Sequence, residues 1–100
     1  MSFQLIAGKM VDAYIGNPAY IILDLREQEA YAAGHIQGAR NLPYIYFDQY
    51  VGKLPYGKTY ILYCHYGSVS MLAGKRMEER GYDVLSISGG ISSYRGRLFV

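Results

Sequence analysis

Residues 60–81 read YILYCHYGSVSMLAGKRMEERG, and this stretch decides the fold. Its first part, residues 60–64, is a continuous apolar run, which is typical of a strand buried on both faces in a parallel sheet. A short loop containing Gly67 follows. Residues 69–80 then have helical spacing, and Gly81 stands where a helix ends. The stretch therefore predicts a strand, a tight loop and a helix that lies on a sheet.

The predicted helix has one apolar face and one charged face. The apolar residues recur at i, i+3, i+4 and i+8 and are expected to face the sheet: Val69, Leu72, Ala73 and Met77. The charged residues expected to face water are Lys75, Glu78 and Glu79.

The rest of the chain repeats this alternation of strand and helix. Apolar runs at residues 20–25 and 84–87 predict further strands, and short pieces at 4–6 and 40–42 would bring the number of strands to five. Helical spacing occurs at residues 10–15 and again at 27–33, where Gly34 ends it. The pattern places the chain in the α/β class.

Composition narrows the possible functions. The chain of 100 residues is 51% hydrophobic and 18% charged, which predicts one globular domain over residues 1–100. Its 10 basic residues are interleaved with 8 acidic ones, so a nucleic-acid partner is not expected. No long apolar segment or targeting sequence is present, so we expect a soluble, cytoplasmic protein without a membrane partner.

The lone cysteine stands at the functional end of the predicted sheet. Ligands of open α/β sheets bind beyond the carboxyl ends of the strands, where Cys64 is expected. The following helix N-terminus would stabilise a thiolate, and Gly67 allows the chain to curl. Ser68 and Ser70 could offer hydroxyl groups to the sulfur, and Ser70 could also cap the helix. A buried cysteine that acts only as a small apolar residue remains the alternative.

Three segments of the sequence resemble the rhodanese family. Residues 23–27 (LDLRE) with 31–43 (YAAGHIQGARNLP) look like the first rhodanese signature. Residues 63–70 (YCHYGSVS) are similar to the active-site loop. Residues 88–94 (SGGISSY) resemble the closing Gly-Gly segment, with Tyr94 where tryptophan is usual. These segments occur in the same order and at the same spacing as in the family, and together they span nearly the whole chain.

This resemblance implies a fold, an activity and a site. The fold would be a five-stranded parallel sheet with helices on both faces. The activity would be that of a thiosulfate sulfurtransferase: the Cys64 thiolate takes sulfur from thiosulfate or a related donor, and a thiol or cyanide accepts it from the persulfide. The substrate would bind in the loop formed by His65, Tyr66, Gly67, Ser68, Val69 and Ser70, whose N–H groups would surround the persulfide. No cofactor is implied.

The loop departs from the family pattern at one position. Val69 stands where an arginine is frequent, and His65 is the only ionisable substitute, either as an anion contact or as an exposed loop residue with no such role. A non-catalytic interaction module, or a sulfur carrier served by a protein partner, therefore remains the alternative function. For Asp24 and Arg26 we expect a mutual or backbone pairing that fixes the loop, not a catalytic role. His35 is expected to make structural hydrogen bonds.

Three other site types are not supported. Residues 52–59 (GKLPYGKT) match a phosphate-binding loop, but a strand follows them where a helix is required. Cysteine-dependent phosphatases place an arginine six residues after the cysteine, and here that residue is Ser70. One cysteine and two histidines do not supply the four ligands of a structural zinc site, so no metal is expected.

Overall fold

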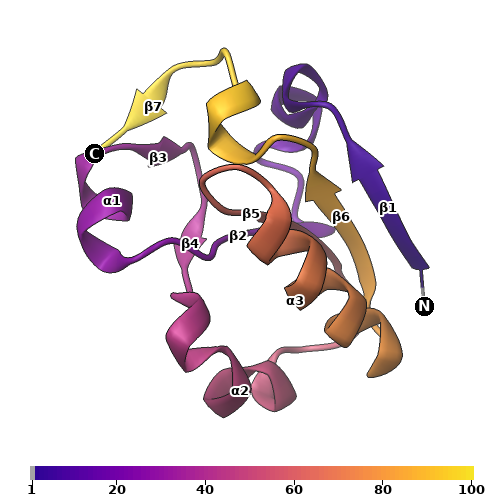
Figure 1. The fold of residues 1–100 in the computed structure, drawn as a ribbon. Helices are drawn as coiled ribbons and strands as arrows, with labels where there is room; N and C mark the ends of the chain where they lie inside the picture. Colours follow the sequence, from indigo (N-terminus) through magenta and orange to yellow (C-terminus); the bar gives the residue numbers. More distant parts are fainter. Residues whose placement is uncertain (1) are drawn as a thin grey trace.

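The computed structural model describes residues 2–100 and is built on one parallel sheet (Figure 1). The strand order is β1-β6-β5-β2-β4, and every neighbouring pair is parallel. The strands are β1 (Ser2–Ile6), β2 (Tyr20–Asp24), β4 (Arg40–Asn41), β5 (Thr59–Tyr63) and β6 (Asp83–Ile87). Each lies within two residues of its predicted segment. The predicted five-stranded α/β sheet is confirmed.

The central strand β5 explains why its sequence is a continuous apolar run. Tyr60 and Leu62 point into the core on one face of the sheet, while Ile61 and Tyr63 point into the core on the other face. All four side chains are fully buried. Because successive side chains of a strand alternate between faces, a strand covered on both sides needs apolar residues at every position.

One face of the sheet is covered by α3 (Ser68–Glu79) and, at its side, by α2 (Phe47–Tyr50) with the flanking 3-10 turns η2 (Tyr44–Tyr46) and η3 (Val51–Lys53) (Figure 1). The end of α3 is the predicted one. Gly81 has a φ of +97°, and the Tyr82 N–H donates to the Met77 carbonyl at 3.1 Å.

The predicted sheet-facing side of α3 is wrong at Leu72, whose side chain is 58% exposed. The buried residues of the helix are Ser70, Ala73, Gly74 and Met77. A Cβ atom at Gly74 would lie 2.5 Å from the ring of Phe3, so the helix lies too close to the sheet there for a larger residue. Small residues therefore face inward, and Leu72 turns toward solvent.

The opposite face is covered by shorter elements. They are the 3-10 helices η1 (Gly8–Tyr14) and η4 (Gly90–Ser93), the short helix α1 (Gln28–Ala33), and a two-stranded antiparallel sheet of β3 (His35–Ile36) and β7 (Leu98–Phe99). The helical spacing of residues 10–15 thus corresponds to 3-10 geometry, and the small sheet was not predicted. Within residues 2–100, no helix has the length and apolar character needed to cross a membrane.

Candidate active site

Cys64 follows the last residue of β5, and its sulfur receives two backbone hydrogen bonds. The Gly67 N–H donates to Cys64 Sγ at 3.1 Å, and the Ser70 N–H donates to it at 3.3 Å. Gly67 has a φ of +106° and precedes the first residue of α3, so the chain curls around the sulfur. The side chain of Cys64 is only 4% exposed. Of the loop amides from 65 to 70 that were predicted to surround the sulfur, those of Gly67 and Ser70 donate to it.

Ser70 lies behind the sulfur and does not cap the helix, so the predicted N-cap is wrong. Helix α3 begins at Ser68, which makes Gly67 the N-cap and leaves Ser70 in the first turn. The Ser70 hydroxyl lies 3.7 Å from Cys64 Sγ, donates to the Gly67 carbonyl at 3.2 Å, and contacts the Ser86 hydroxyl at 2.8 Å. Both serines are fully buried. Ser86 is a contributor that the sequence did not indicate, since one serine in a weak apolar run carries no special signal.

The back of the cysteine loop rests on the backbone of the Gly-Gly segment. The Ile91 N–H donates to the Cys64 carbonyl at 2.9 Å, and the Ser92 N–H donates to the His65 carbonyl at 3.2 Å. A Cβ atom at Gly90 would lie 2.5 Å from the Cys64 carbonyl oxygen. Glycine at this position therefore allows the direct backbone contact that braces the loop.

A cleft of about 560 Å³ opens in front of the sulfur. Of the predicted substrate-binding residues, His65, Tyr66, Ser68 and Val69 line it, together with Cys64; Gly67 and Ser70 are buried and do not line it. Val69 also packs against the core beneath α3. The remaining lining residues come from two segments after β2 and β4: Leu25, Arg26, Glu27, Pro43, Tyr44 and Ile45.

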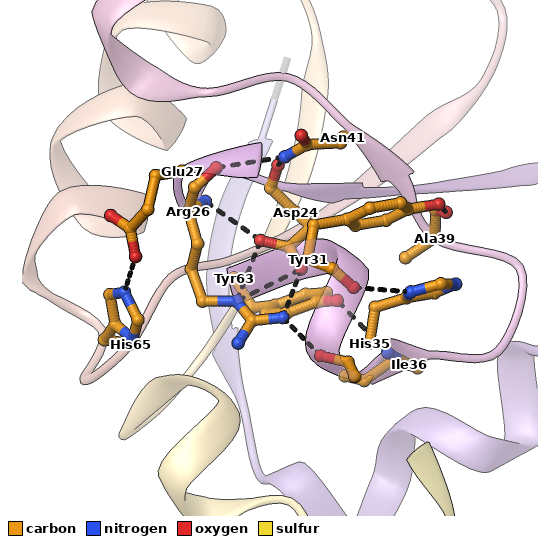
Figure 2. A network of polar contacts seen from close by, with 11 residues as sticks. Asp24, Arg26, Glu27, Tyr31, His35, Ile36, Ala39, Asn41, Tyr63 and His65 are labelled. Carbon is orange, nitrogen blue, oxygen red and sulfur yellow. Dashed lines mark hydrogen bonds and ion pairs between the residues drawn. The ribbon is translucent and has the colours of Figure 1, made fainter. Parts of the chain in front are cut away.

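Asp24 and Arg26 form the expected pair (Figure 2). The Arg26 Nη2 donates to Asp24 Oδ2 at 2.7 Å, and Nε donates to both carboxylate oxygens at 3.0 and 3.1 Å. Nη2 also donates to the Gly34 carbonyl at 2.6 Å. The Asn41 amide donates to the Asp24 and Arg26 carbonyls, each at 3.0 Å. The pair thus joins β2, the end of α1 and β4, and only Arg26 borders the cleft.

His65 faces a carboxylate at the edge of the cleft. Its Nε2 lies 2.6 Å from Glu27 Oε1, and the side chains are 47% and 61% exposed (Figure 2). The hydrogen bond from His65 lowers the pKa of Glu27. Glu27 was not predicted as part of the site, because an exposed glutamate near a helix start is an ordinary surface residue.

His35 and the segment 52–59 lie apart from this cleft. The His35 Nδ1 is 2.9 Å from the Tyr31 carbonyl, and the two rings stack with centroids 3.9 Å apart. These contacts fit the expected structural role. The segment 52–59 leads directly into β5 at Thr59, so a strand follows it as the sequence indicated.

Comparison with known proteins identifies the family. The model of the rhodanese-like domain family matches residues 8–97. The chain is 33% identical over 78 residues to a tRNA sulfurtransferase of Desulfurococcus amylolyticus, which covers 78% of this chain but only 15% of that protein. It is 30% identical over 76 residues to the thiosulfate sulfurtransferase GlpE of Pseudomonas fluorescens, covering 75% of this chain and 70% of GlpE.

The fold also matches solved structures. The crystal structure of a rhodanese-like domain protein from Staphylococcus aureus superposes with a TM-score of 0.86, covers 97% of each chain, and is 20% identical in sequence. Because the family model matches residues 8–97, which is most of the chain, the chain belongs to the family of rhodanese-like domains.

Proposed function

We propose that this protein is a sulfurtransferase in which Cys64 carries sulfane sulfur as a persulfide. The observation that carries the proposal is the convergence of the Gly67 and Ser70 N–H groups on Cys64 Sγ, at 3.1 and 3.3 Å. Fixed amide dipoles at these distances stabilise negative charge on sulfur. The relatives named as sulfurtransferases support the same reading.

In the first step the Cys64 thiolate attacks the outer sulfur of a sulfane donor. With thiosulfate, the thiolate electron pair forms the new S–S bond, the old S–S bond breaks, and its electrons leave with sulfite. The product is a Cys64 persulfide anion. Its negative charge lies on the outer sulfur, in front of the first turn of α3, where the helix dipole is favourable.

In the second step a thiophilic acceptor takes the outer sulfur. Cyanide attacks that sulfur, the S–S bond breaks, and the electron pair returns to Cys64 as thiolate while thiocyanate leaves. A thiol acceptor would react in the same way, with its thiolate as the attacking species. The cycle needs neither a metal nor a redox cofactor, because the oxidation level of the transferred sulfur is supplied by the donor.

The loop residues have different parts in this proposal. The main chain of Gly67 and Ser70 holds the reacting sulfur, while His65, Tyr66, Ser68 and Val69 line the cleft where the donor binds. The Asp24–Arg26 pair positions the loop after β2 that forms the facing wall, and does not touch the reacting atoms.

A non-catalytic interaction module is the second candidate. The observation in its favour is Glu27, whose carboxylate lines the cleft and would repel an anionic donor. Under this alternative Cys64 would not accept sulfur from small molecules.

Intact-mass spectrometry separates the two candidates. The protein is incubated with a large excess of thiosulfate, desalted, weighed, and weighed again after cyanide is added. We expect a gain of one sulfur that cyanide removes, with thiocyanate released in equal amount. Cys64→Ser should fold normally and gain no sulfur, because the hydroxyl is a far poorer nucleophile. An unchanged wild-type mass with thiosulfate and with organic thiosulfonates would overturn the proposal.

A further inference from the structure

Each basic side chain that lines the cleft is paired with a carboxylate. The Arg26 guanidinium donates three hydrogen bonds to Asp24, and its side chain is only 7% exposed. His65 is held by Glu27 at 2.6 Å. Among the described residues that line the cleft, no positive charge is therefore left without a carboxylate partner.

This pairing bears on the charge that a donor can carry. Thiosulfate is a dianion, and it approaches a thiolate that is itself negative. The amides on the loop can compensate one developing charge, but a second charge needs a cation that the cleft does not offer. The Glu27 carboxylate holds the His65 side chain, so His65 is not free to offset that second charge. The electrostatics of the cleft favour a donor with a single negative charge.

The walls of the cleft are largely apolar. Ile45 and Tyr66 line it and are 82% and 79% exposed, although both are large side chains with extensive apolar surface. Leu25, Pro43 and Val69 also line it and are less exposed. A volume of about 560 Å³ is within the range of small-molecule sites. An organic group bound between Ile45 and Tyr66 would remove apolar surface from water, whereas a sulfonate group would not.

We infer that the preferred donor is a monoanionic organic sulfane-sulfur compound, whose apolar body lies between Ile45 and Tyr66. This inference rests on the proposed function of Cys64. The step for a thiosulfonate is balanced in the same way as for thiosulfate: the Cys64 thiolate bonds to the outer sulfur, the S–S bond breaks, and the electron pair leaves with a sulfinate anion.

Three small donors test charge and apolar contact separately. Thiosulfate carries two charges and no organic group, methanethiosulfonate carries one charge and a methyl group, and benzenethiosulfonate carries one charge and an aromatic ring. Thiocyanate formation from cyanide gives kcat/KM for each. We expect benzenethiosulfonate to exceed methanethiosulfonate by about five- to tenfold, since an aromatic ring would bury roughly 40–60 Å² more apolar surface.

The donors also differ in intrinsic reactivity. Comparing each variant with the wild type for the same donor cancels this difference. Ile45→Ser should reduce the benzenethiosulfonate-to-methanethiosulfonate ratio about fivefold. Leu72→Ser is the matched control, since Leu72 is 58% exposed and does not line the cleft, and it should leave the ratio unchanged.

Two further variants test the charge. Val69→Arg should raise kcat/KM for thiosulfate by about tenfold, through a charge-assisted contact, without a matching gain for benzenethiosulfonate. Glu27→Gln should raise kcat/KM for thiosulfate by about two- to fivefold, and this gain should shrink as salt is added. Glu27→Gln keeps the charge test available if the arginine variant does not fold.

The outcomes separate the two proposals. Sulfur transfer with thiosulfate preferred over benzenethiosulfonate, or with an unchanged ratio in Ile45→Ser, would overturn the donor inference and leave the sulfurtransferase function standing. No transfer from any of the three donors would overturn both. A higher thiosulfate rate in Glu27→Gln together with a reduced ratio in Ile45→Ser would support the inference.

Discussion

Replacing Gly90 with alanine should displace the cysteine loop, because no space exists for a side chain there. The added Cβ atom would lie 2.5 Å from the Cys64 carbonyl oxygen and 2.7 Å from both the carbonyl carbon and oxygen of His65. All three are backbone atoms, and their position is fixed by hydrogen bonds from Ile91 and Ser92. The backbone on one side or the other has to move, and Cys64 Sγ moves with it.

The expected loss of stability has two parts. Gly90 has a φ of +64°, and an alanine in this left-handed region costs about 1–2 kcal/mol. Forcing the two backbone segments apart adds about 1–3 kcal/mol, the usual cost of overpacking. Gly90→Ala should therefore lower the free energy of unfolding by about 2–5 kcal/mol.

A matched variant isolates the steric part. Gly38 has a φ of +81°, but a Cβ atom there would have no neighbour within 4 Å. Gly38→Ala should therefore lose only the conformational part, about 1–2 kcal/mol.

Urea unfolding of both variants measures the difference, and the rate of Cys64 alkylation by iodoacetamide reports on the sulfur. We expect altered alkylation only in Gly90→Ala. Equal losses of stability in the two variants, with unchanged alkylation in both, would refute the argument that the Gly-Gly segment braces the loop.

Three further predictions concern the buried polar groups. Ser70→Ala should lower the free energy of unfolding by about 1–3 kcal/mol, because the buried Ser86 hydroxyl loses its partner. The control is Ser68→Ala, at an exposed position of the same helix. In the same urea assay its free energy of unfolding should stay within about 0.5 kcal/mol of the wild-type value. Arg26→Met should lower the free energy of unfolding by about 3–5 kcal/mol, because it leaves the carboxylate of Asp24 buried without its cation. The double variant with Asp24→Asn should lose less stability than the sum of the two single variants, and additive losses would contradict this. Burial and the Asp12 carboxylate raise the pKa of Tyr94 to about 12, so this tyrosine stabilises the fold fully below pH 10 and loses its contribution as the pH rises from about 10 to 12. Tyr94→Phe should flatten that part of the pH dependence, and an equally steep fall in the variant would show that Tyr94 is not its source.

The strand, loop and helix around Cys64 could be predicted because their signals are local. An apolar run without alternation indicates double burial, and β5 is buried on both faces. A glycine after a helical pattern indicates the helix end, and Gly81 adopts the expected positive φ. The placement of Cys64 beyond β5 then follows from the strand direction alone.

The outward position of Leu72 on α3 could not be predicted by the same means. Hydropathy assigns Leu72 to the inside, but the distance between α3 and the sheet is set by contacts to Phe3 on β1, more than 60 residues earlier in the chain. Close approach selects small residues such as Gly74 and Ser70, which a search for apolar periodicity does not register.

The facing wall of the cleft depends on sheet order. The segment containing Tyr44 and Ile45 comes to Cys64 because β4 pairs with β2 and β2 pairs with β5. Nothing in the residues 43–46 themselves indicates this neighbour. The Glu27–His65 contact arises in the same way, between the loops after two adjacent strands.

In the cysteine loop, main-chain atoms and side chains have separate tasks, so such a protein can change its substrate by changing side chains alone. The atoms that hold the sulfur are amides of Gly67 and Ser70, and the atoms that brace the loop belong to the backbone of residues 90–92. The side chains at 65, 66, 68 and 69 face the cleft and take no part in either task. A library randomised at these four positions should therefore yield altered donor selectivity while retaining a reactive cysteine in most of its folded members.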